Sequence, residues 1–170
     1  VRLAFGIDEA DPAFEPLRQR LLALYEAHLL VDTAPFPGIA ELLHALAARG
    51  IRWGVVTNKP NYLAEPLLAR ARLEPPADVL VCPDHVQRTK PDPEPLLLAC
   101  ERLRCAVTEA VYVGDHARDI QAGRNAGMRT IAATYGYLEP DEAVAQWQAD
   151  WHADSVPAIA HILFTHFLTA

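Results

Sequence analysis

Short runs of apolar residues alternate with helix-like patterns along most of the chain. In the helix-like segments, apolar residues recur every three or four positions, whereas the runs between them are too short for buried helices. This alternation predicts an α/β fold in which helices cover both faces of a parallel sheet. The expected strands are residues 51–57, 78–82, 110–114, 129–133 and, more weakly, 151–154, and the expected helices are residues 39–48, 62–72, 94–104, 118–126, 141–148 and 157–167.

The first 34 residues form a separate region of the sequence. Asp11 and Pro12 are typical of a helix start, and apolar residues follow at helical spacing from Phe14 to His28. Residues 3–7 are apolar and of strand length. A proline-containing loop begins at Pro35, so we place a domain boundary there.

Composition narrows the class of protein. There are 22 acidic and 15 basic residues, and the net charge of -7 argues against nucleic-acid binding, which needs a basic face. No apolar run approaches the roughly 18 residues that a membrane span needs. The three cysteines have no metal-binding spacing and are typical of free thiols in a reducing cytoplasm. These features predict a cytoplasmic protein with neither nucleic-acid nor membrane partners.

Candidate chemistry stands where the expected strands end. The strand at 51–57 ends at Thr57 and is followed by Asn58 and Lys59, whose amide and ammonium can form an anion cradle with the Thr57 hydroxyl. Lys90 lies in the loop before the helix at 94–104, and in parallel sheets the carboxyl ends of the strands meet at one edge. Taken separately, Thr57 and Asn58 can also simply cap the next helix, and Lys90 can be a solvated loop cation.

Two acidic residues begin the helix that follows the strand at 110–114. Asp115 and Asp119 are four residues apart and suit a hard cation such as Mg²⁺. The alternative is a helix cap with a first-turn acid. His116 is either a substrate contact or an exposed loop residue. The sequence has no GxxxxGK[ST], GxGxxG or GxSxG pattern, which argues against P-loop hydrolases, dinucleotide enzymes and serine hydrolases of that type.

Taken in order, these residues resemble the haloacid dehalogenase-like phosphatase superfamily. Thr57 after an apolar strand, Lys90 followed by proline, and the GDxxxD pattern at residues 114–119 match its second, third and fourth motifs. The resemblance covers about residues 35–133 and implies a Rossmann-like core with a helical cap. Within the superfamily, three segments look like phosphoglycolate phosphatases and equally like N-acetylmuramic acid 6-phosphate phosphatases: residues 82–86, 90–96 and 135–137.

The resemblance implies Mg²⁺-dependent hydrolysis of a small phosphate ester through an aspartyl-phosphate. Thr57, Lys90 and Asp115 would be catalytic, and Asn58 would bind phosphate together with Thr57 and Lys90. Asp115 would ligate Mg²⁺, and Asp119 would assist directly or through water. We expect phosphoglycolate-like substrates, with N-acetylmuramic acid 6-phosphate as the alternative. The partner is then a small molecule, and the protein is a monomer or a homodimer.

The chain departs from the family at the nucleophile, because it contains no DxD pattern. The nearest mimic places Gly6 at the nucleophile position and Asp8 at the acid/base position. We expect instead that residues 1–34 are the C-terminal part of the cap and that residues 35–170 are a core lacking its first strand. That strand, with the nucleophile, would lie upstream, and the 170-residue chain would be inactive. A non-catalytic phosphate-binding domain or fragment is the alternative of another class.

Overall fold

The computed structural model describes residues 2–28, 33–138 and 143–167. The chain divides into two compact units, residues 1–34 and residues 35–170, which are described separately. The assignment of the first unit to a helical cap stays a prediction. No helix in the described ranges is both long enough and apolar enough to cross a membrane.

The first unit contains two helices, α1 (Arg2–Phe5) and α2 (Phe14–Ala27). Residues 3–7, although apolar and of strand length, do not form a strand, because α1 occupies most of that segment. Asp11 does shape the chain before α2, since its carboxylate accepts a hydrogen bond from the Ala13 amide at 2.8 Å. The helix itself begins at Phe14, later than the predicted start.

The second unit alternates strands and helices, as the apolar pattern predicts. The segment expected to be a helix at 141–148 lies partly outside the described residues, and its described part holds a 3-10 turn. The elements in chain order are α3 (Ile39–Ala47), β1 (Gly54–Val56), α4 (Asn61–Ala71), β2 (Val79–Val81), η1 (Pro83–His85), α5 (Glu94–Leu103), η2 (Val107–Glu109), β3 (Val111–Gly114), α6 (Ala117–Ala126), β4 (Arg129–Ala133), η3 (Val144–Trp147), β5 (Trp151–Ala153) and α7 (Val156–His166).

The strands form two separate parallel sheets. β1 pairs with β2, and β4 lies between β3 and β5 in the second sheet. In the described part of the chain, β1 and β3 are not paired with each other, and no strand lies between them. The edges of β1 and β3 that do not face β2 and β4 therefore remain without a partner strand among the described residues.

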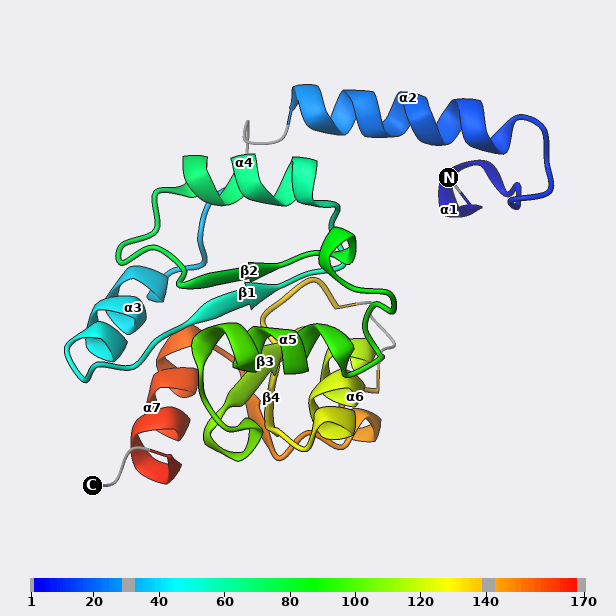
Figure 1. Ribbon diagram of the computed structural model, residues 1–170. Helices are drawn as coiled ribbons and strands as arrows, with labels where there is room; N and C mark the ends of the chain where they lie inside the picture. Colours follow the sequence, from blue (N-terminus) through cyan, green and yellow to red (C-terminus); the bar gives the residue numbers. More distant parts are fainter. Residues whose placement is uncertain (1, 29–32, 139–142, 168–170) are drawn as a thin grey trace. The chain divides into compact units, whose positions relative to one another are not determined.

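Helices cover both faces of the sheets, which confirms the predicted α/β architecture. Side chains of α5 and α6 form one cluster with Met128, and Figure 1 shows α5 in front of β3 with α6 next to it. Side chains of α3 and α7 pack on the opposite face. Strand alternation explains the division, because Val111 contacts the α3–α7 cluster and its neighbour Tyr112 contacts the α5–α6 cluster.

Two local features fix how the helices meet the strands. Gly50 ends the α3 region with a left-handed backbone (φ 67°), and its amide donates to the Ala47 carbonyl at 2.9 Å. Gly123 lets α6 approach β4, because a Cβ there would stand 2.5 Å from Cγ2 of Thr130. The close contact at Gly123 holds α6, and with it the first turn of this helix, against the sheet.

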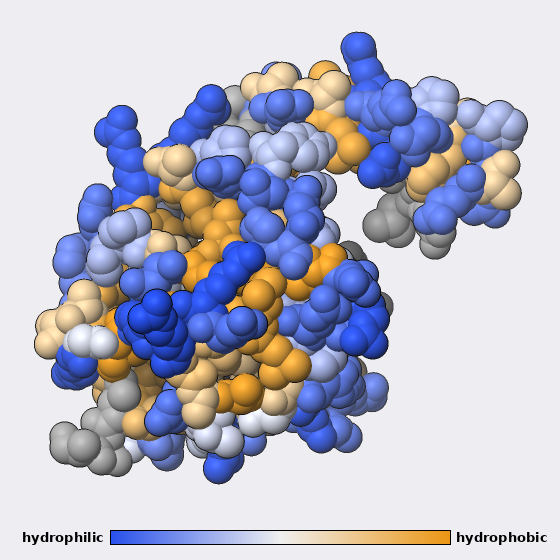
Figure 2. All heavy atoms as spheres, in the orientation of Figure 1, coloured by the Kyte–Doolittle hydropathy of each residue, from blue (hydrophilic) through white to orange (hydrophobic). Residues whose placement is uncertain are grey.

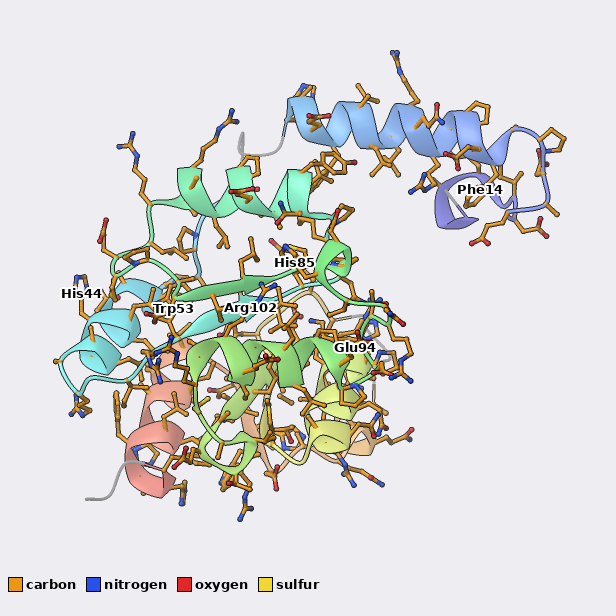
Figure 3. The ribbon with its side chains drawn as sticks, viewed as in Figure 1. Phe14, His44, Trp53, His85, Glu94 and Arg102 are labelled. Carbon is orange, nitrogen blue, oxygen red and sulfur yellow. The ribbon has the colours of Figure 1, made fainter. Side chains whose placement is uncertain are left out.

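The outer face of α5 carries both apolar and charged groups. In Figure 2, which has the orientation of Figure 1, apolar surface gathers around α5 between hydrophilic margins, and Leu97 on this helix is exposed. Arg102, near the end of α5, donates to the Leu80 carbonyl of β2 at 3.1 Å (Figure 3). All three cysteines are free thiols.

Candidate active site

Thr57 continues β1 by one residue beyond its assigned end. Its amide donates to the Val81 carbonyl at 3.0 Å, so the backbone remains in register with β2. Its hydroxyl Oγ1 accepts the Lys59 amide at 3.0 Å. This bond closes a tight turn immediately after the strand, and it holds the Thr57 hydroxyl at the carboxyl end of the sheet.

The loop that carries Lys90 is held from two sides. Nδ2 of Asn58 donates to the Lys90 carbonyl at 3.1 Å, and Nδ2 of Asn125 on α6 donates to the Pro91 carbonyl at 3.0 Å. The two sheets therefore contribute anchors to the same short segment: one follows β1, and the other lies in the helix after β3. Lys90 is thereby fixed between the two strand ends.

Glu94 closes the loop from its other end. Its carboxylate accepts the amides of Gln87 and Arg88 at 2.9 and 3.0 Å, at the first turn of α5 (Figure 3). The hydrogen bond from Gln87 is the main reason that the pKa of Glu94 lies below its ordinary value, with further lowering by Arg88. The segment from Gln87 to Glu94 is thus a closed and well-bonded loop.

The Lys90 ammonium is buried and makes three short contacts. Nζ lies 2.8 Å from the Val56 carbonyl, 2.7 Å from the Tyr112 hydroxyl and 2.8 Å from Oδ1 of Asp119. Lys90 and Asp119 are only 9% and 8% exposed. A buried cation needs such compensation, because removal from water would otherwise favour its neutral form.

Asp115 lies directly after β3 in a crowded position. A Cβ on Gly136 would stand 2.5 Å from Cβ of Asp115 and 2.6 Å from its Oδ2, so only glycine fits beside this carboxylate. Burial raises the pKa of the neighbouring Tyr135, and the negative charge of Asp115 raises it further. The carboxylate is therefore held between β3 and the turn that follows β4.

Asp115 does not cap α6, although a capping role was the alternative to metal binding. His116 is the N-cap, since its Nδ1 accepts the Arg118 amide at 3.1 Å. His116 is exposed, and this bond occupies one of its ring nitrogens. Asp119 belongs to the first turn, where its amide donates to the His116 carbonyl at 2.8 Å. The helix start therefore brings Asp119 to Lys90 and leaves Asp115 without a capping role.

The residues present fit part of a Mg²⁺ site. Carboxylate oxygens are the ligands that Mg²⁺ prefers, and Asp115 and Asp119 supply them from one turn. However, Oδ1 of Asp119 is paired with Lys90, and no three His, Cys, Asp or Glu side chains gather into a ligand set within the described ranges. Asp115 is thus the better-placed ligand of the two.

Sequence reasoning missed Tyr112, which contacts Lys90 from β3. The signal was a hydroxyl-bearing aromatic in a strand of otherwise small and aliphatic residues, where a buried hydroxyl requires a partner. It also missed the Val56 carbonyl, which accepts hydrogen bonds from both Lys90 and Tyr112. Side-chain patterns carry no information about which backbone carbonyl a lysine will meet.

Comparison with known proteins gives one consistent family. Residues 5–133 match the family described as haloacid dehalogenase-like hydrolase. The chain is 47% identical over 163 residues to N-acetylmuramic acid 6-phosphate phosphatase of Pseudomonas aeruginosa, a match that covers 96% of this chain and 72% of that protein. It is 41% identical over 158 residues to phosphoglycolate phosphatase of Xanthomonas campestris, a match that covers 92% of this chain and 72% of that protein.

A solved structure agrees with these relatives. A predicted phosphoglycolate phosphatase of Haemophilus somnus superimposes with a TM-score of 0.81 at 28% identity, over 92% of this chain and 68% of that one. The similarity extends over both units of the chain, since it reaches well beyond the 136 residues that begin at Pro35.

Proposed function

This chain belongs to the haloacid dehalogenase-like hydrolase family, and on that premise we propose that the protein hydrolyses a small phosphorylated metabolite with the help of Mg²⁺. The observation that carries the proposal is the buried Lys90 ammonium, which is held beside Asp119 where β1 and β3 end. An oriented cation at a strand end neutralises negative charge on the phosphoryl group during its transfer. Positioning and charge neutralisation are what a protein must supply for phosphoryl transfer.

Thr57 and Asn58 complete the phosphate cradle in this proposal. The Thr57 hydroxyl accepts the Lys59 amide, so its own proton remains available to donate to a phosphoryl oxygen. The Asn58 side chain is used to hold the Lys90 loop, which leaves its backbone amide as the donor to phosphate. Lys90 then serves as the compact charge that balances the phosphate.

Asp115, assisted by Asp119, would hold Mg²⁺. The metal, when bound, supplies charge neutralisation for the phosphate and for an attacking carboxylate. Asp119 has a second task, because its negative charge compensates the buried Lys90 ammonium. Asp119 therefore fixes the cation at the site even where it is not itself a direct ligand of the metal.

Two substrates are the first to test. The relative at 47% identity is an N-acetylmuramic acid 6-phosphate phosphatase, and the relative at 41% is a phosphoglycolate phosphatase. The residues at the strand ends act on the phosphoryl group, which both compounds share. These residues therefore do not distinguish one substrate from the other. We place N-acetylmuramic acid 6-phosphate first because of the higher identity, followed by 2-phosphoglycolate.

The nucleophile is the part of the mechanism that the described residues do not provide. The family transfers phosphate through an aspartyl-phosphate, and the 170 residues contain no DxD pattern. We propose that the intact protein has this carboxylate on a strand between β1 and β3, and that residues 1–34 belong to the cap. A non-catalytic phosphate-binding role is the second candidate, and it is favoured by the same missing motif.

The test is release of inorganic phosphate by the protein expressed from its native reading frame. N-acetylmuramic acid 6-phosphate and 2-phosphoglycolate are supplied with Mg²⁺ or with a chelator, and kcat/KM is measured for each. We expect Mg²⁺-dependent release from at least one of them. Phosphate binding without any release would favour the non-catalytic role.

A further inference from the structure

The Lys90 ammonium has no donor left for a substrate in this arrangement. Its three N–H groups point to three partners: the Val56 carbonyl, the Tyr112 hydroxyl and the Asp119 carboxylate. Val56 is part of β1, whereas Tyr112 belongs to β3 in the other sheet. The cation therefore bridges strands that no backbone hydrogen bond joins within the described ranges.

The Tyr112 hydroxyl has a defined direction. It accepts a hydrogen bond from Lys90 Nζ at 2.7 Å and donates its own proton to the Val56 carbonyl at 3.1 Å. Burial raises the pKa of Tyr112 well above its ordinary value, and the charges of Asp119 and Asp115 raise it further. The hydroxyl thus keeps its proton, and its lone pairs stay directed at the ammonium.

The ring of Tyr112 is itself held by packing. It contacts a cluster of buried side chains from α5, α6 and the turn before β4: Leu96, Cys100, Ala122 and Met128. A Cβ on Gly123 would stand 3.4 Å from Cβ of Tyr112, so the helix leaves room for the ring. Because the ring is fixed, the position of its hydroxyl is fixed too.

We propose that Tyr112 is a positioning residue that holds the Lys90 ammonium at the end of β1 beside Asp119. This inference rests on the proposed function for its catalytic consequence, but the contact itself can be tested without any activity. Asp119 alone would attract Lys90 from any direction. Tyr112 and the Val56 carbonyl add two directional bonds, and together the three partners leave the ammonium one orientation.

The chain makes a direct test simple, because Lys59 and Lys90 are its only lysines. Protein labelled with ¹⁵N-lysine gives two side-chain ammonium signals, and Lys59 serves as the internal reference. The rate at which the Lys90 ammonium protons exchange with water reports directly on its hydrogen bonds. Tyr112→Phe removes the hydroxyl and keeps the ring, whereas Tyr62→Phe makes the same chemical change at an exposed site on α4.

We expect the Lys90 ammonium to exchange about tenfold faster in Tyr112→Phe, as for loss of one hydrogen bond, and to be unchanged in Tyr62→Phe. Ile162→Val, in the α3–α7 cluster, controls for general loss of stability. Equal rates in wild type and Tyr112→Phe would overturn the proposal. An equal acceleration in Ile162→Val would also overturn it, since the effect would then be merely structural.

The catalytic consequence is read in the protein expressed from its native reading frame. There we expect Tyr112→Phe to lower kcat about tenfold and to leave KM nearly unchanged, because the substrate still meets the same charge. A raised KM at unchanged kcat would contradict a positioning role, because Tyr112 would then contribute to substrate binding instead. If no variant, including wild type, releases phosphate while the Lys90 exchange behaves as expected, the proposed function fails and the positioning of Lys90 by Tyr112 stands.

Discussion

Gly136 lies against Asp115 so closely that a methyl group on its Cα would stand 2.6 Å from the Asp115 carboxylate oxygen Oδ2. The two residues come from different strand ends, since Asp115 follows β3 and Gly136 follows β4. The turn after β4 therefore determines where the proposed metal ligand can point.

Replacing this glycine should move the carboxylate. We expect Gly136→Ala to lower phosphate release by the native-frame protein at least tenfold, and to destabilise the fold by about 1–3 kcal/mol through overpacking. Gly50→Ala controls for loss of stability alone, because an alanine there strains the left-handed backbone but its Cβ meets no atom within 4 Å. Normal activity in Gly136→Ala would show that Asp115 need not be held there.

The Lys90–Asp119 pair should matter for stability as well as for chemistry. Lys90→Met leaves the Asp119 carboxylate buried without its partner, and we expect a loss of about 3–5 kcal/mol in the free energy of unfolding by urea. Arg88→Met instead removes the ion pairs of an exposed guanidinium with Asp92 and Glu94, and we expect a loss below about 1 kcal/mol. Adding Asp119→Leu to Lys90→Met should recover part of the loss. A Lys90→Met protein as stable as wild type would contradict the buried pair.

Stability should fall in alkaline solution because of Cys100. Burial and the neighbouring Cys105 thiol raise the pKa of Cys100 from 9.0 to about 11. Unfolded Cys100 loses its proton near pH 9, whereas folded Cys100 keeps it, so the stabilisation is complete below pH 9 and is lost as the pH approaches 11. At 1.36 kcal/mol per pH unit, the loss amounts to about 2–3 kcal/mol.

Urea unfolding between pH 8 and 11 measures this effect. Cys100→Ala should show a shallower decline than wild type, although Tyr112 adds a further decline above pH 10, because its pKa is raised too. Identical slopes for wild type and Cys100→Ala would contradict the assignment to Cys100.

The 170-residue chain should release no phosphate from small esters, since it has no DxD pattern. Among the described residues, no group of three or more His, Cys, Asp or Glu side chains gathers around Asp115. Its purified preparations, with Mg²⁺, should match a buffer control. Turnover that disappears in Asp115→Asn would contradict this expectation, and it would direct the search for a nucleophile to Asp8.

The sequence pattern predicts the second unit well because its signals are local. Apolar runs mark β1 to β4, and Gly50 ends a helix through its own backbone freedom. The segment at residues 3–7 shows the limit: an apolar stretch of strand length becomes a helical turn, because only a neighbouring strand can decide between the two forms.

The candidate site was predictable in its residue types but not in its bonds. Lys90 and Asp119 were both identified, yet as a phosphate ligand and a metal ligand rather than as partners of each other. Their pairing depends on how α6 and the loop before α5 meet in space, through Asn125 and the Pro91 carbonyl. Such contacts between distant segments leave no periodic pattern in the sequence.

The most direct test of the central claim is Mg²⁺-dependent phosphate release by the native-frame protein and its Asp115→Asn variant, with Asp154→Asn as an exposed control. We predict that wild type and Asp154→Asn release phosphate from N-acetylmuramic acid 6-phosphate or 2-phosphoglycolate, and that Asp115→Asn slows release at least about a hundredfold. No release from either substrate, or equal rates in wild type and Asp115→Asn, would contradict a phosphatase site at these strand ends.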